Sequence, residues 1–278
     1  MMSSALLYAL LVLPGCSGET VAPPPEPVKP VDVPSGPAPS IALEELKAAA
    51  QNIALVPSPA EMQKAMEKAG IVEGLSKLVV ERKLRVDVEN KDVVAVRTGV
   101  ILADALLTVR DAPKEKLIER LTTVKVGLTA LGAGADISAT IDDLNARIGN
   151  DGISRDDLVK ELDEMHGAII PEIKFEAGER CVPLLQAGSW LEGSNLVASA
   201  IINANKPEAA SQLLRQPQVA DYFLKYVQVE GSGKAPDEVI KQLDATLHKL
   251  KDIAAQPTLS ADDVKTIKSE TDAVLALL

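Results

Sequence analysis

Two segments of the chain are apolar on nearly every side of a helix, unlike the rest of the sequence. They cover about residues 93–109 and 182–202, and small residues such as Gly99, Gly188 and Gly193 occur within them. A helix that is hydrophobic all round is buried among other helices, and small residues let neighbouring backbones approach closely. We therefore expect two central helices inside an all-α bundle or array.

The remaining segments show apolar positions on one helical face, as in the series Leu117, Leu121, Val124, Leu128, Leu131 and the series Val239, Leu243, Leu247, Leu250, Ala254. Helix starts are marked by Ser58, Ser154 and Ser260, each followed three residues later by an acidic residue. Strand-like alternation occurs only in Lys83–Val88, where we expect a short extended link. The pattern predicts helices with no substantial sheet.

The N-terminus begins with a different kind of apolar run, Ala5–Leu13. It is far shorter than the roughly 20 residues of a membrane-spanning helix and fits the central region of a signal peptide. The run closes on Leu13-Pro14-Gly15-Cys16, which resembles the lipobox of bacterial lipoproteins. The resemblance implies a signal peptide over residues 1–15 and lipid modification, such as palmitoylation, at Cys16.

Residues 16–40 contain the candidate lipid anchor followed by eight prolines and no apolar periodicity. Proline favours the extended polyproline II conformation, so this disordered tether could span roughly 70 Å at about 3.1 Å per residue. The same resemblance implies, from Ser17 after the acylated cysteine, export to the outer membrane with the protein facing the periplasm. We therefore expect a protein of the bacterial cell envelope that contacts the membrane through Cys16.

Residues 41–278 are long enough to form one large helical domain. The blocks that start at Gly99 and at Gly188 resemble each other, which leaves a duplication into halves of about 41–150 and 151–278 as an alternative. A second alternative makes residues 182–202 a membrane span. The polar residues Gln186, Glu192 and Asn195 argue against such a span.

Composition and charge exclude several classes of function. The formal net charge of -11 repels nucleic acid, and aromatic residues at 2% provide no row of rings on which bases could stack. His166 and His248 lack the spacing of metal ligands, and the chain has neither a P-loop nor a Gly-x-Ser-x-Gly motif. We expect no metal, no cofactor and no catalytic residue, and we expect Cys181 to be a small buried hydrophobe.

Two carboxylates fall inside the apolar central segments, Asp104 in the first and Glu192 in the second. A buried charge costs several kcal/mol unless it is paired, so each needs a partner or faces a cavity. Arg97 lies on the same helical face as Asp104, and Arg180 is the nearest cation upstream of Glu192. Structural ion pairs are one interpretation. A polar pocket between the central helices, with Trp190 and Arg97 beside the two carboxylates, is the other.

These observations predict an anchored lipoprotein whose helical domain is a non-catalytic binding or scaffold module with a protein partner in the envelope. The alternative function is binding of a small molecule or ion at Asp104, Glu192, Trp190 and Arg97. A closed polar pocket would favour a ligand, whereas an exposed apolar strip would favour a protein partner.

Overall fold

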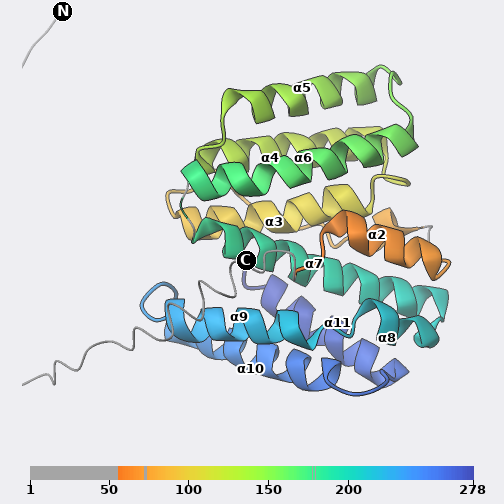
Figure 1. Cartoon of the computed structure of the whole chain (residues 1–278), viewed down its shortest axis with the longest axis vertical. Helices are drawn as coiled ribbons and strands as arrows, with labels where there is room; N and C mark the ends of the chain where they lie inside the picture. The colour runs from red at the N-terminus through yellow and green to blue at the C-terminus, as the bar shows by residue number, and fades with distance from the viewer. Residues whose placement is uncertain (1–55, 72–73, 177, 179) are drawn as a thin grey trace, which may run out of the picture. The chain divides into compact units, whose positions relative to one another are not determined.

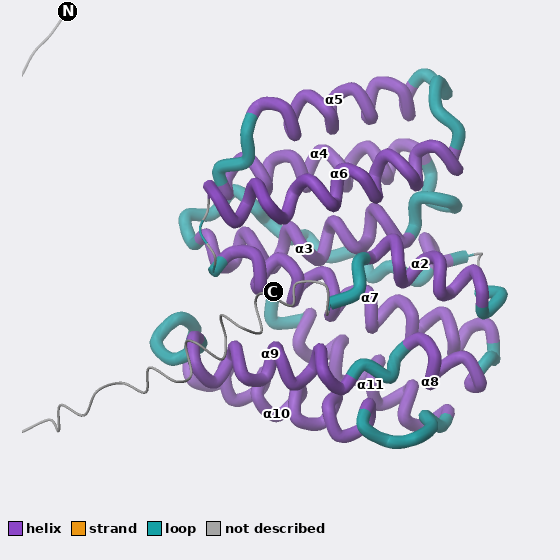
Figure 2. The backbone as a smooth tube through the Cα atoms, in the orientation of Figure 1, coloured by secondary structure: helices purple, strands orange, loops and turns teal. Residues whose placement is uncertain are grey.

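The apolar and amphipathic segments become helices joined by short connections in the computed structural model, which describes residues 56–71, 74–176, 178 and 180–278 (Figures 1 and 2). These residues form ten α-helices, two short 3-10 helices and no strand, which confirms the all-α prediction. The signal peptide, Cys16 and the tether lie outside the described residues. The α-helices are α2 (Pro59–Lys68), α3 (Lys91–Leu107), α4 (Lys114–Leu131), α5 (Ala135–Gly149), α6 (Arg155–Glu176), α7 (Cys181–Ala204), α8 (Ala210–Leu213), α9 (Pro217–Glu230), α10 (Asp237–Ala254) and α11 (Ala261–Leu275).

The helix boundaries follow from local hydrogen bonding. Ser58 and Ser260 form capping boxes with Glu61 and Asp263 at the starts of α2 and α11, as predicted. Gly132 ends α4 with φ of 99°, a left-handed conformation that glycine adopts without a steric penalty. The helices α2 and α11 therefore start, and α4 ends, where local sequence signals place these termini.

The two central segments form α3 and α7, which share the most extensive interface among the described helices. Gly99 and Gly188 sit at their crossing. A Cβ atom on Gly99 would lie 2.0 Å from Leu185 O, and one on Gly188 would lie 2.0 Å from Val96 O. The contact is reciprocal and needs glycine on both helices, because no side chain fits between the two backbones. Close backbone approach at small residues is confirmed.

The other helices extend this central pair into an array. Contacts run from α5 through α4 to α3, and from α7 through α11 and α10 to α9, with α6 against both α5 and α7. Buried side chains form two clusters, one built mainly from α3 to α6 and the start of α7, the other from α2, the rest of α7 and α8 to α11. A core boundary at residue 150 is not visible, and the duplication into halves stays a prediction.

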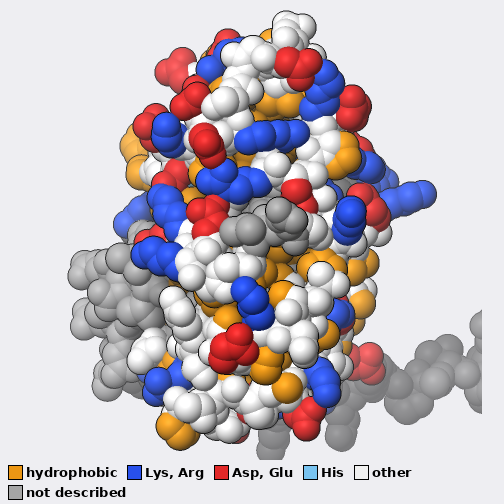
Figure 3. Space-filling view, turned by 90° about the vertical axis from the view of Figure 1, so that its right-hand side faces the viewer, with side chains coloured by type: hydrophobic (Ala, Val, Ile, Leu, Met, Phe, Trp, Pro, Cys, Tyr) orange, Lys and Arg blue, Asp and Glu red, His pale blue; other side chains and the backbone are white. Residues whose placement is uncertain are grey.

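The surface carries many charges of both signs. In the face drawn in Figure 3, acidic and basic side chains lie next to one another at the level of α4 to α6. Many of them form exposed ion pairs, such as Lys114–Asp151 and Lys125–Asp142. Exposed pairs of this kind each contribute little to stability. Within the described residues, no helix combines the length and hydrophobicity needed to cross a membrane.

Candidate functional site

The crossing of α3 and α7 brings Asp104 and Glu192 together. Asp104 follows Gly99 by five residues, and Glu192 follows Gly188 by four. Because α3 and α7 run in the same direction from their crossing, both carboxyl groups lie at about the same distance beyond it. The two carboxyl groups interact directly, and each shifts the pKa of the other. Asp104 is 8% exposed and Glu192 is 0% exposed. The prediction that both lie buried in the central helices is confirmed.

Arg82 reaches this pair from the extended segment between the 3-10 helix Leu75–Lys77 and α3. In that segment Leu84, Val86 and Val88 pack inward, while the residues between them are exposed. Arg82 precedes Leu84 by two residues, so in an extended segment its side chain points to the same buried face. Its Nη1 lies 2.6 Å from Glu192 Oε2, and its side chain is 14% exposed. Glu192 is therefore one half of a nearly buried ion pair.

Arg120 approaches from α4, on the same face as the buried Leu117 and Val124. Its Nη1 donates to Thr108 Oγ1 at 2.8 Å, and the Thr108 hydroxyl donates to the backbone oxygen of Asp104 at 2.5 Å. The Thr108 side chain thus positions the guanidinium over the C-terminal end of α3. Arg120 is 9% exposed, so a second cation is buried at the carboxyl pair.

Of the two carboxyl groups, Asp104 is the one that binds a proton more readily. Burial raises the pKa of Asp104 well above its usual value, and the neighbouring charge of Glu192 raises it further, against the opposing effect of Arg120. Burial also raises the pKa of Glu192, but Arg82 opposes that rise. Two buried oxygens, Asp104 Oδ1 and Glu192 Oε1, have no donor among the described residues. A neutral Asp104 that donates to an ionised Glu192 reduces this deficit and keeps only one negative charge in the core.

Asp104 opens onto a polar pocket with a volume of about 380 Å³. The extended segment forms one wall of the pocket, and α3 and α4 form the others. Its polar lining comes from Glu81, Arg82, Lys83, Asp104, Lys116, Glu119, Arg120 and Thr123. This volume falls within the range of pockets that bind small molecules. We call it the Asp104 pocket.

The pocket differs from the predicted one in position and in two of its residues. It lies beside α3 rather than between α3 and α7. Trp190 is on another side of α7, where its ring packs against Phe223 with centroids 5.4 Å apart and its Nε1 donates to Gln216 at 2.8 Å. Helical phase explains the difference, because Trp190 precedes Glu192 by two residues and so points away from it.

Arg97 does not pair with Asp104. Its guanidinium donates to the backbone oxygens of Arg85 and Leu278. Seven residues, two helical turns, put Arg97 on the same face as Asp104 but about 10 Å along the axis, too far for contact. Arg180 likewise pairs with Asp92, at 2.6 Å, rather than with Glu192. The predicted cation partners were wrong: Arg82 pairs with Glu192, and Arg120 is the buried cation near Asp104.

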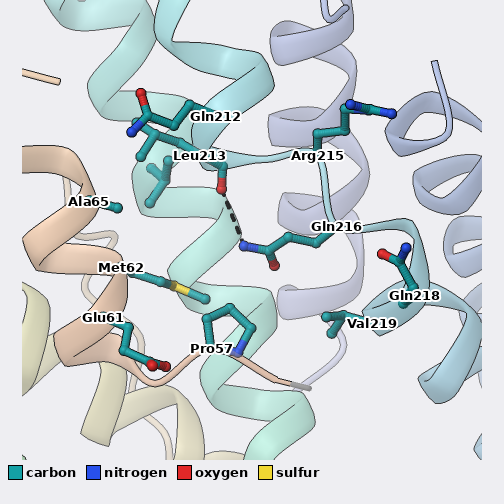
Figure 4. A pocket seen from close by; sticks show the side chains of 11 residues that line it. Pro57, Glu61, Met62, Ala65, Gln212, Leu213, Arg215, Gln216, Gln218 and Val219 are labelled. Carbon is teal, nitrogen blue, oxygen red and sulfur yellow. Dashed lines mark hydrogen bonds between the residues drawn. The ribbon is translucent and has the colours of Figure 1, made fainter. Parts of the chain in front are cut away.

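A larger cavity, of about 540 Å³, lies between the start of α2, α7 and the turn before α9 (Figure 4). Its central polar side chain, Gln216, points its amide nitrogen at Leu213 O at 3.3 Å and accepts from Trp190 through Oε1. Both ends of this amide are satisfied within the protein. The Asp104 pocket is the better candidate site because its lining includes a buried cation, Arg120, and a buried carboxyl group, Asp104, with an unpartnered oxygen.

Arg82 and Arg120 were missed in the sequence, although each carried a signal. Arg82 extends the alternation of Lys83–Val88 by one inward position, and Arg120 interrupts the apolar stripe of α4. A charged residue on a buried face needs a buried partner. Matching these two cations to the two carboxylates in the central helices would have located the site.

The described residues contain no group of three or more His, Cys, Asp or Glu side chains that could hold a metal ion. Cys181 is buried, as predicted, and burial raises the pKa of its thiol. Comparisons with protein-family models, with curated proteins and with solved structures found no match to this chain.

Proposed function

We propose that this chain is a membrane-anchored binding protein whose helical domain holds a small polar molecule in the Asp104 pocket without catalysing a reaction. The observation that supports this most is the buried Asp104, paired with Glu192 behind it, at the wall of a polar pocket of about 380 Å³. Well-packed hydrophobic residues would stabilise a helix crossing at least as well as buried charges. Polar groups retained there favour a functional site.

The distribution of exposed apolar side chains supports a small ligand over a protein partner. Among the described residues, the large exposed hydrophobic side chains come from separate parts of the chain: Val80, Val126, Phe175, Ile202, Val229 and Leu277. Apolar residues that are exposed singly are normal on a protein surface, whereas an interface needs a continuous patch. A scaffold role would need such a patch, whereas ligand binding needs only the Asp104 pocket.

A non-catalytic role agrees with the chemistry of the lining. Its residues include no His, Cys or Ser, and the hydroxyl of Thr123 donates to Glu119 O at 2.9 Å. Glu192, which does not line the pocket, is held by Arg82. These groups can orient a ligand, and none is placed as a nucleophile with an adjacent base.

A pocket-filling substitution tests ligand binding. Thr123→Phe places a ring in the pocket, and Val126→Phe is the matched control because Val126 is an exposed residue of the same helix that does not line the pocket. We would measure the melting temperature with alanine, glucose, succinate, ethanolamine and glycerol 3-phosphate. We expect at least one compound to stabilise the wild type and the control but not Thr123→Phe. Equal shifts in both variants, or no shift with any compound, would contradict the proposal.

The proposed anchor rests on Cys16, which lies outside the described residues. Mass spectrometry of the protein purified from bacterial membranes tests it. We expect a mature chain that begins at Cys16 and carries acyl chains, and we expect Cys16→Ser to release the protein from the membrane fraction. An unmodified Cys16 in the mature protein would refute membrane anchoring by this route.

A further inference from the structure

Arg120 carries a buried positive charge whose ion pair is long and involves an exposed carboxylate. Its one hydrogen-bond acceptor among the described residues is the neutral hydroxyl of Thr108. The nearest ionised carboxylate is Glu81, with Oε1 at 3.7 Å from Arg120 Nη2, beyond hydrogen-bonding distance. The Glu81 side chain is 66% exposed, so water screens much of this attraction. The contacts of Arg120 within the described residues thus offset only part of the free-energy cost of burying its charge.

The charges around Arg120 leave the pocket with a positive excess. Arg82 is matched by Glu192, and Asp104 is neutral when it holds its proton. Lys83, Lys116 and Arg120 then face only two lining carboxylates, Glu81 and Glu119. This local excess occurs in a chain with a net charge of -11. An anion that reaches the pocket finds a cation there that the protein has not neutralised.

We propose that the Asp104 pocket recognises its ligand through a carboxylate or phosphate group bound to the guanidinium of Arg120. This inference rests on the proposed function and names the class of ligand for the same pocket. A guanidinium presents several N–H donors in a planar fork, which suits the oxygens of either anion. Thr108 accepts from Nη1, and Nη2 lies 3.7 Å from Glu81 without a hydrogen bond to it, so an anion in the pocket would compete with Glu81 for this donor.

The opposite choice, a cationic ligand on the two carboxyl groups, has less support. Glu192 is 0% exposed and bound to Arg82, so a ligand cannot reach it without displacing an arginine. A cation would also pass Lys83 and Lys116 at the pocket wall and lie next to Arg120. Binding of a cation is therefore an outcome of the test that would refute the proposal.

A matched series of small probes tests the charge of the ligand. Propionate, propionamide and propylammonium have similar size and differ in charge, and methyl phosphate tests the second anionic group. We would measure the dissociation constant of each by titration calorimetry with the folded domain at low salt. We expect propionate or methyl phosphate to bind at least about tenfold more tightly than propionamide, and the tighter of the two identifies the anionic group. Propionamide or propylammonium binding as tightly as both anions would overturn the proposal.

Two variants separate recognition from structure. Arg120→Gln should weaken anion binding by about tenfold or more while leaving the melting temperature of the free protein unchanged or higher, because it removes a poorly compensated buried charge. Glu81→Gln should tighten binding, because it removes a carboxylate that competes for Arg120. An unchanged affinity for anions in Arg120→Gln would refute the role of Arg120. So would an Arg120→Gln variant that fails to fold, if the wild type also binds no anion. If glucose or ethanolamine binds in the pocket while anions do not, the proposed function stands and this inference fails.

Discussion

Asp104 and Glu192 lie side by side but should respond oppositely when each is replaced by its amide. Asp104→Asn replaces a neutral acid with a neutral amide of the same shape, and Asn can donate to Glu192 as the protonated acid does. Glu192→Gln removes the carboxylate that pairs with Arg82. Both substitutions replace a carboxyl group with an amide of nearly the same size. The difference between their effects on the free energy of unfolding therefore shows which carboxyl group is ionised.

The geometry of the pair sets the magnitude. Glu192 is 0% exposed and lies 2.6 Å from Arg82, whose side chain is 14% exposed. Removing one partner of a buried ion pair costs about 3–5 kcal/mol, and the small exposure of Arg82 places the expected cost near the lower limit, at about 3 kcal/mol. For a domain of this size that corresponds to a decrease of about 6–12 °C in melting temperature. Asp104→Asn should instead raise the free energy of unfolding at pH 7, because the wild type must take up a proton on Asp104 when it folds and the amide variant does not.

Thermal melts and urea titrations of the folded domain at pH 7 measure both effects. The urea m-value should be the same in all three proteins if only the native state is affected. If Asp104→Asn destabilises the domain as much as Glu192→Gln does, Asp104 is ionised and the assignment of the proton is wrong. If Glu192→Gln has no effect, the ion pair with Arg82 does not contribute to stability.

Three further measurements follow from the same structure. Folding raises the pKa of Asp104, so the stability of the wild type relative to Asp104→Asn should be greatest below the ordinary Asp pKa and should fall as the pH rises toward the folded pKa. Urea titrations at several pH values should show a decrease of at most about 1.4 kcal/mol per pH unit. Gly188→Ala should destabilise the domain by more than about 2 kcal/mol, since its Cβ would lie 2.0 Å from Val96 O. The control Gly167→Ala, whose Cβ would meet no atom within 4 Å, should stabilise the domain by about 0.5–1 kcal/mol. Equal effects of the two substitutions would contradict the close helix crossing. Ser58→Ala should lower the stability by about 1 kcal/mol in the same assay through loss of its cap, and no change would mean that the start of α2 is frayed.

The helices were predictable because their signals are local. Apolar positions repeat within a few residues, and a capping serine acts on a backbone N–H three residues away, as Ser58 and Ser260 do. The central helices were recognised because nearly every position is apolar, a property that does not depend on which neighbour covers which face. The predicted ranges of 93–109 and 182–202 correspond to Lys91–Leu107 and Cys181–Ala204.

The site was only half predictable, because its partners come from segments distant in sequence. Buried carboxylates are visible as charges within apolar runs, and both Asp104 and Glu192 were identified that way. Their cations were sought nearby in the chain, yet Arg82 is 110 residues from Glu192. Sequence proximity favoured Arg97, whose guanidinium binds the backbone of the extended segment instead. Pairing across such distances depends on the packing of the whole array.

The close crossing of α3 and α7 explains why the pair must be neutralised from outside the two helices. At Gly99 and Gly188 the backbones leave no space for a side chain, and the crossing also excludes water from the carboxyl groups just beyond it. One charge can be compensated by Arg82, which enters from the extended segment, and the other is removed by a proton. Arg120 is then left as a buried cation whose compensation by the protein is weak. An anionic ligand in the Asp104 pocket would complete the charge balance that the helix crossing leaves open.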